Sequence, residues 1–335
     1  MHYLLTAAAK TLSLPTIAAM SDEKVEELLR VLRWRETEGR PVCPECGCDA
    51  IYTIRARSQY RCKRCSHTFS VTSGTVFHAH KLPLRSILML CFLWGNAVKG
   101  VSALQMRRDI GLSHKAAYVL LQKMREALFA QRDKTQLEGE VEIDGMYVGG
   151  KIRKANKAVN RPHENWKPTE KKCVLAIRQR DPNARGALRT LVTVAESESE
   201  ESVVPFVTQN VAPKTTIFAD EHASYHGLAA WYDLRRVNHS REYRADGGEH
   251  INLCESLFIR FRRLQLGQTH KLTGRYLLNY AYEVAYRDDH RRWSNGAIMM
   301  DMLGKALRTP ACETWRAYWR KRRDNAVPAK AVQAA

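Results

Sequence analysis

The first third of the chain places apolar residues at helical spacing. Residues 21–34 predict a helix that is capped by Ser21 or Asp22. Residues 84–94 predict a more apolar helix, and residues 101–125 predict two helices on either side of a tight turn. The apolar face expected for the first helix consists of Val25, Leu28, Leu29, Val31 and Leu32.

The pattern changes after a polar linker at residues 135–139. Short runs rich in Val, Ile and Thr predict four strands, at residues 141–148, 173–178, 188–195 and 216–219. Helical spacing returns at residues 202–209, 250–263 and 276–287. Strands and helices thus share one region, which predicts a domain of the α/β class.

These patterns divide the chain into segments of different character. Its 335 residues suffice for two or three domains and at least one sizeable core. We expect a helical segment at 1–40, a cysteine-rich module at 41–78, a helical domain at 79–134, an α/β domain at 135–305 and a basic tail at 306–335.

The charge of the chain is strongly positive. Lys and Arg number 54 against 35 Asp and Glu, a formal net charge of +19. Such an excess attracts polyanions, with nucleic acid as the first candidate and an anionic membrane as the second. A generally basic, solvated surface is the alternative. No stretch is long and apolar enough to cross a bilayer, and the N-terminal residues lack the pattern of a signal peptide, so we expect a cytoplasmic protein.

Two cysteine pairs predict a zinc site. Cys43 and Cys46 form one C-x₂-C pair, Cys62 and Cys65 form the other, and the spacing between the pairs is typical of a four-cysteine zinc ribbon. Four thiolates fill the coordination sphere of Zn²⁺, so the ion is expected to be structural. Cys48 and His67 are further donors nearby, which we interpret as residues that do not bind the ion.

Basic and aromatic residues are interleaved within this module. They suit contacts with phosphates and stacking on bases, although a solvated basic face is the alternative. The basic residues are Arg55, Arg57, Arg61, Lys63 and Arg64, and the aromatic ones are Tyr52 and Tyr60.

Residues 101–125 are a candidate helix-turn-helix. Gly111 lies at the expected turn, and Ser113 is placed to cap the second helix. A plain helical hairpin would have the same pattern. The small core is expected to use Ala103, Leu104, Ile110, Leu112, Ala117, Val119, Leu120 and Met124. The side chains expected to face a major groove are His114, Lys115, Tyr118, Gln122 and Lys123.

Three carboxylates follow the order strand, strand, helix. Asp144 lies within an apolar strand, Asp220 ends another, and Glu255 lies on a later helix. Phosphoryl transfer uses hard oxygen ligands for two Mg²⁺ ions, and acids in this order are able to supply them. Taken singly, Asp144 could cap a turn, Asp220 could begin a helix, and Glu255 could pair with Arg260 or Arg262. Glu283 is a rival for Glu255.

The chain resembles bacterial insertion-sequence transposases of the DDE type that begin with a zinc ribbon, the ISXO-like class. The likeness covers nearly the whole chain, about residues 21–295. One departure is Gly145, where an acid often follows the first aspartate. The matching stretches are CPECG at 43–47, CKRCSHTFSVTSGT at 62–75, EIDGMYVGGK at 142–151, ADEHASY at 219–225 and HINLCES at 250–256.

The resemblance implies an RNase H-like catalytic domain, a mixed sheet flanked by helices, preceded by the zinc ribbon and the helix-turn-helix. It implies that Asp144, Asp220 and Glu255 hold two Mg²⁺ (or Mn²⁺) ions. His250 and Asn252 are expected to support this site, although an ordinary helix start is an equal alternative for them. Basic residues expected to hold DNA near it are Lys151, Arg153, Lys154, Arg260, Arg262 and Arg263.

The expected function is therefore DNA transposition by a cytoplasmic, nucleoid-associated enzyme. It would bind double-stranded DNA at the terminal inverted repeats of its element, cut it and join it to target DNA, as a homodimer or larger assembly. One alternative is a zinc-ribbon regulator that binds DNA without chemistry. The other is an RNase H-like nuclease that cuts without joining.

Overall fold

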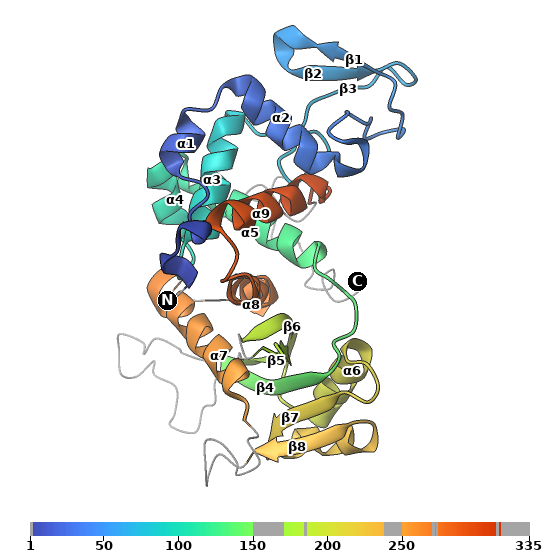
Figure 1. The fold of residues 1–335 in the computed structure, drawn as a ribbon, viewed down its shortest axis with the longest axis vertical. Coiled ribbons are helices and arrows are strands. Elements are labelled where there is room, and N and C mark those ends of the chain that lie inside the picture. Colours follow the sequence, from blue (N-terminus) through green and yellow to red (C-terminus); the bar gives the residue numbers. More distant parts are fainter. Residues whose placement is uncertain are drawn as a thin grey trace, which may run out of the picture. The chain divides into compact units, whose positions relative to one another are not determined.

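The computed structural model describes residues 3–149, 171–183, 186–237, 250–269, 272, 274–312 and 315 (Figure 1). They form two compact units. Unit 1 takes the described residues up to Arg132 and those from His290 onward, and unit 2 takes those within Asp133–Asp289. No helix in the described part of the chain is both long and apolar enough to span a membrane.

Unit 1 contains a set of packed helices. They are α1 (Leu14–Ala18), α2 (Asp22–Arg33), α3 (Leu84–Asn96), α4 (Ala103–Ile110), α5 (His114–Ala130) and α9 (Asn295–Arg308). The Ser21 hydroxyl accepts a hydrogen bond from the Lys24 backbone N–H at 3.3 Å, so Ser21 caps α2 as predicted. Val25 and Leu29 are buried, but Val31 is 48% exposed and does not belong to the apolar face.

Helix α9 packs against α2, α3 and α5. The Asn295 side chain accepts hydrogen bonds from the Thr11 and Leu12 backbone N–H groups at 3.0 and 3.1 Å. Arg308 donates to the Leu32 carbonyl at 3.0 Å. The structure therefore groups residues 290–305 with the N-terminal helices, whereas the sequence pattern assigns them to the α/β domain. A long-range return of the chain leaves no signal in local periodicity.

The cysteine-rich module folds as a small antiparallel sheet of β1 (Ile51–Ile54), β2 (Gln59–Cys62) and β3 (Thr68–Phe69). Trp34 lies edge-on to Tyr60 and Phe69, with ring centroids 5.8 and 6.3 Å apart. Tyr60 is buried and its hydroxyl donates to the Glu26 carboxylate on α2. Tyr60 therefore anchors the sheet to the helix, and its predicted role in base stacking is wrong.

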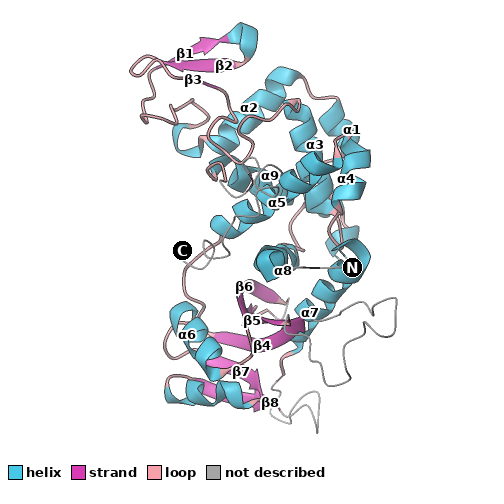
Figure 2. Cartoon of the chain, turned by 180° about the vertical axis from the view of Figure 1, so that it is seen from behind, coloured by secondary structure: helices cyan, strands magenta, loops and turns pink. Residues whose placement is uncertain are grey.

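Unit 2 is built on a five-stranded mixed sheet in the order β6-β5-β4-β7-β8 (Figure 2). Strands β4, β5 and β6 pair antiparallel, and β7 and β8 run parallel to β4. The bounds are Glu140–Val148 for β4, Lys172–Arg180 for β5, Ala187–Ala195 for β6, Thr216–Asp220 for β7 and Asp233–Val237 for β8. The mixed sheet confirms the predicted fold class.

Helices cover both faces of this sheet. One face packs against α6 (Glu200–Asn210) and the 3₁₀ segment η6 (Ala223–Ala230), through a core that includes Val141, Ile143 and Val203. The other face packs against α7 (Asn252–Leu264) and α8 (Gly274–Asp289). Successive residues of a strand point to opposite faces, so Glu142 and Asp144 share the face of α7 and α8.

A buried ion pair ties this second face together. The Arg178 side chain on β5 is 1% exposed and donates to the Asp288 carboxylate of α8 at 2.6 Å. The same guanidinium donates to the Leu253 carbonyl of α7 at 2.5 Å. Breaking such a pair by removal of one partner leaves a buried charge without compensation. Arg178 therefore fixes α7 and α8 to the sheet.

Candidate metal sites and nucleic-acid surfaces

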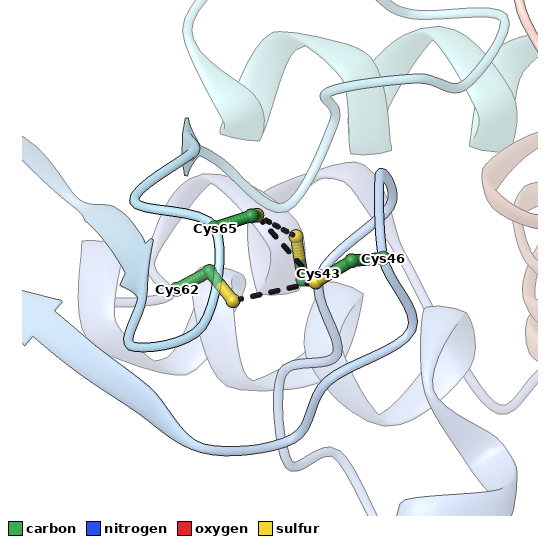
Figure 3. A group of neighbouring side chains, drawn as sticks. All are labelled: Cys43, Cys46, Cys62 and Cys65. Atoms are coloured by element: carbon green, nitrogen blue, oxygen red, sulfur yellow. Dashed lines mark hydrogen bonds between the residues drawn. The ribbon is translucent and has the colours of Figure 1, made fainter.

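The four predicted zinc ligands lie together in unit 1 (Figure 3). The sulfur atoms of Cys43, Cys46, Cys62 and Cys65 all lie within 4.8 Å of one another. The Sγ atoms of Cys43 and Cys65 are 3.6 Å apart, as are those of Cys46 and Cys62. The donor set is that of a closed zinc site, so the cluster supports a structural Zn²⁺.

Two turns of the same shape hold these cysteines. In the first, the Cys43 N–H donates to Cys48 O at 2.9 Å; in the second, the Cys62 N–H donates to His67 O at 3.0 Å. The fifth residue of each turn has positive φ, 70° at Gly47 and 60° at Ser66. Gly47 thus permits the tight geometry as predicted, whereas Ser66 adopts the same conformation with a side chain.

Backbone N–H groups in the second turn face a thiol. The Arg64 N–H donates to Cys62 Sγ at 3.3 Å. Hydrogen bonds from the backbone of Cys65 and Arg64 lower the pKa of Cys62 to about 6. Cys48 and His67 do not belong to the four-sulfur group, as expected, and the His67 ring instead stacks on Phe69 with centroids 6.1 Å apart.

The ribbon presents its basic residues to solvent. Tyr52 and Arg61 are cross-strand partners on β1 and β2, and Tyr52 is 59% exposed. The Lys63 ammonium lies 4.7 Å from the centroid of the Tyr52 ring. Exposed as well are Arg55, Arg57, Arg61, Lys63 and Arg64. These side chains form a basic, partly aromatic surface, which we call the ribbon face.

Helices α4 and α5 flank the predicted turn. Gly111 ends α4 with φ 73°, and the Ser113 hydroxyl caps α5 by accepting from the Ala116 N–H at 3.1 Å. Ala117 and Met124 are buried as expected, but Leu104 is 46% exposed. Met106 of α4, which the predicted core did not include, is fully buried.

The residues expected to face a groove divide into two groups. His114 and Lys115, in the first turn of α5, are exposed, and Tyr118 is half-buried. Gln122 is fully buried, so the prediction that it contacts DNA is wrong. Lys123 is half-buried, and burial lowers its pKa. The reason is that α5 packs against both α4 and α9, so its middle turns are more enclosed than those of a two-helix motif.

Asp144 and Asp220 lie on neighbouring parallel strands. The register pairs Ile143 of β4 with Ala219 of β7, which places Asp144 and Asp220 one residue further along on both strands. Adjacent strands are about 4.8 Å apart. The two carboxylates therefore lie side by side on the sheet face that α7 covers.

Glu255 reaches this face from the first turn of α7. The turn is held by Glu142, a fully buried carboxylate on β4 that accepts from the Leu253 and Cys254 N–H groups at 2.8 and 3.4 Å. An acid at a helix N-terminus satisfies free N–H groups and complements the helix dipole. Glu142 thus attaches the helix of Glu255 to the strand of Asp144.

The pKa of Asp144 is raised to about 7. Burial is the main cause, and the neighbouring carboxylates of Glu198, Asp220 and Glu255 add to it. Within the described residues, none of these four acids is ion-paired with Lys, Arg or His. The alternative in which Glu255 pairs with Arg260 or Arg262 is therefore not observed; Arg260 pairs with Asp288 at 3.0 Å.

Carboxylate oxygens without cationic partners fit Mg²⁺, which prefers hard oxygen ligands. In the described part of the chain, only the four cysteines bring three or more possible ligand atoms within 4.8 Å of one another. The acids therefore lie further apart than the thiols. The Asp144 carboxylate also accepts from the Gly145 N–H at 2.8 Å. The chemistry of these oxygen donors thus fits a divalent ion.

Other predicted residues have partners or lie elsewhere. His250 Nδ1 lies 3.2 Å from Glu142 Oε1, and Arg180 donates to the His250 carbonyl at 2.6 Å. Asn252 is exposed as the first residue of α7, and Arg262 and Arg263 are exposed near its end. Glu283 is fully buried and pairs with Arg287 at 2.8 Å, so it does not replace Glu255. The predictions for Lys151, Arg153 and Lys154 lie outside the described residues.

Two acids of this region were not anticipated from the sequence, Glu142 and Glu198. Glu142 was detectable as a second carboxylate within the apolar strand, two residues before Asp144. For Glu198 the signal was Gly145, because glycine inside a strand marks close approach by another group.

Comparison with known proteins finds a matching family model for a segment of each unit. Residues 136–289 match the ISXO2-like transposase domain, and residues 20–68 match the transposase zinc-ribbon domain. The chain is 27% identical over 259 residues to the "Uncharacterized protein in transposable element ISH50" of Halobacterium salinarum. That alignment covers 72% of this chain and 83% of its relative.

Proposed function

The chain belongs to the insertion-sequence transposases that carry an ISXO2-like transposase domain, and on that premise we propose that it cuts and joins DNA with Asp144, Asp220 and Glu255. The observation that supports this most is the convergence of these acids on one sheet face, where burial and then the neighbouring carboxylates raise the pKa of Asp144. Binding alone has no use for such a charged cluster.

In the proposed reaction, two Mg²⁺ ions would activate the attacking oxygen and stabilise the leaving one. Asp144, Asp220 and Glu255 would hold them. Glu142 would keep α7, and with it Glu255, at the edge of the cluster. Water first hydrolyses one strand at each element end, which releases a 3′-OH. That hydroxyl then attacks a phosphodiester of target DNA in line, so the number of phosphodiester bonds is conserved in the joining step.

Separate surfaces would hold the DNA. We propose that the ribbon face and the first turn of α5 bind the terminal inverted repeats, because their exposed basic residues suit phosphate contacts. His114 and Lys115 would contact the bases, with Tyr118 beside them. Arg262 and Arg263, near the end of α7, would hold DNA at the acids, and His250 and Asn252 would support α7. Two ends must be joined together, so a homodimer or larger assembly is expected.

The test uses purified protein, a DNA fragment with the element ends, a target plasmid and Mg²⁺. Wild-type protein should cut the ends and transfer them into the plasmid. Asp144→Asn, Asp220→Asn and Glu255→Gln should bind the ends with unchanged affinity but yield no product. Cleavage by any one of these variants at the wild-type rate would remove that residue from the site.

The same assay separates the two alternatives. A regulator would bind the ends but cut nothing, even as wild type. A nuclease would cut the ends, but fragments that already carry a free 3′-OH would not be transferred into the plasmid.

A further inference from the structure

The Glu198 carboxylate lies against the backbone of β4 at Gly145, the residue that follows Asp144. A Cβ atom built on Gly145 would lie 2.5 Å from Glu198 Cδ and 2.7 Å from both carboxylate oxygens. No real side chain tolerates such distances, so Glu198 keeps this place only while residue 145 is glycine. The residue that follows Asp144 therefore leaves room for an acid from another segment.

Two tyrosines hold Glu198 in this position. Its backbone N–H donates to the Tyr147 hydroxyl of β4 at 3.1 Å. The Tyr225 hydroxyl donates to Glu198 Oε1, and Tyr225 is itself fully buried in η6. These anchors follow Asp144 and Asp220 closely in the sequence, so Glu198 is fixed to the same two segments that position those acids.

Glu196 is a surface carboxylate of the same segment and serves as a comparison for Glu198. Glu196 is exposed and forms an ion pair with Lys172. Glu198, two residues later, forms no ion pair with a cationic side chain among the described residues, and its negative charge raises the pKa of Asp144 instead. Of the neighbouring carboxylates that raise the pKa of Asp144, Glu198 contributes most, ahead of Asp220 and Glu255. A carboxylate in such a place needs a cation.

We propose that Glu198 is a fourth carboxylate ligand of the divalent-metal site, admitted by Gly145 and positioned by Tyr225. The inference rests on the proposed function. Two divalent ions bring four positive charges, which four carboxylates balance and three do not. Glu198 Oε1 is engaged by Tyr225. Oε2 therefore remains for a metal ion.

The competing explanation is that Glu198 serves only to accept the hydrogen bond from Tyr225. Glu198→Gln separates the two roles, because the amide oxygen still accepts from Tyr225 while the negative charge is removed. Glu196→Gln is the matched control, since it removes a charge from the same segment at a residue that is paired with Lys172.

The experiment titrates Mn²⁺ into the full-length protein without DNA and measures free Mn²⁺ by electron paramagnetic resonance. Glu198→Gln should weaken Mn²⁺ binding about tenfold, in line with the effect of residues that tune a metal site. Its Tm without metal should stay at or above that of wild type. Glu196→Gln should bind Mn²⁺ as wild type does, and Asp144→Asn should lose it.

The outcomes separate the two proposals. Wild-type Mn²⁺ affinity in Glu198→Gln together with loss in Asp144→Asn would overturn the role of Glu198 and leave the proposed function in place. Unchanged affinity in both variants would refute the metal site itself. If Glu198→Gln does not fold, Mn²⁺ binding is measured on Gly145→Ala instead, because the added Cβ displaces the Glu198 carboxylate. Weaker Mn²⁺ binding then supports the proposal, and unchanged binding overturns it.

Discussion

The thiol cluster of unit 1 and the acid cluster of unit 2 are both candidate metal sites, and they are assembled in opposite ways. The four sulfur atoms come from two local turns and lie within 4.8 Å of one another. The acids come from two strands, a helix and a loop, and they remain further apart. The sulfur atoms are already grouped closely, whereas the acids stay separated and form no ion pair with a Lys, Arg or His among the described residues.

The difference follows from what each ion does. A structural zinc stabilises a small module that has too little core of its own, so its ligands gain from being fixed by backbone hydrogen bonds. A catalytic pair of ions must accept substrate oxygens as well, so the protein must not fill every coordination position. Four predictions test this contrast, in order of decreasing effect.

The largest effect is expected from Asp144→Asn. Loss of this carboxylate should reduce cleavage of element ends about a thousandfold or more, because it lies centrally among the acids. Zinc content and affinity for DNA should not change. Gel assays of cleavage and binding, with metal analysis, check this. Asp233→Asn, an exposed acid of β8, is the control, and equal loss in both variants would contradict a special role for Asp144.

Removal of a zinc ligand should have the converse effect. Cys62→Ser should unfold the ribbon and weaken binding of the element ends about a hundredfold, since folding of such modules depends on the metal. Amide protons of β4 and β5 should keep their protection in hydrogen exchange. Cys48→Ser, a nearby cysteine outside the four-sulfur group, should behave as wild type. Loss of protection in unit 2 would show that the two sites are not independent.

Glu142→Ala tests whether the open site depends on a fixed scaffold. Without this cap, the first turn of α7 loses its acceptor and Arg180 loses a partner at 3.0 Å. Cleavage should fall about tenfold to a hundredfold, with zinc content unchanged. Glu140→Ala removes another partner of Arg180, at 3.2 Å, that does not touch α7. An equally large defect in Glu140→Ala would mean that Arg180, and not the cap, is important.

The smallest effect concerns stability and pH in the absence of metal. The pKa of Asp144 is raised to about 7 in the folded protein, above its ordinary value of 3.8. The folded protein therefore keeps a proton that the unfolded chain loses, and the stability this group contributes below pH 4 is lost as pH rises to about 7. Asp144→Asn should therefore raise Tm at pH 8 by about 3 °C, and by less at pH 5. A fall in Tm at pH 8 would contradict the uncompensated charge.

Much of the fold and part of the site were predictable from the sequence. The zinc ligands were found because their spacing is local, and strands β4 to β7 were found because their runs are rich in Val, Ile and Thr. Gln122 was misplaced because burial of α5 depends on α9, a helix far along the chain. The roles of Glu142 and Glu198 depend on how β4 meets α7 and the loop before α6. Spacing within one segment holds no information about such contacts.

The return of α9 to the N-terminal helices makes unit 2 an insertion within the chain of unit 1. The polypeptide enters unit 2 once and leaves it once, so two covalent tethers, near residues 132 and 290, connect the two units. A domain connected to its neighbour by two covalent segments has a smaller range of motion than a domain connected by a single segment. A chain shortened after residue 289 would retain Asp144, Glu198, Asp220 and Glu255 and lose α9, the last helix of unit 1. The truncation would therefore destabilise unit 1, which carries the zinc ribbon, before it affects unit 2.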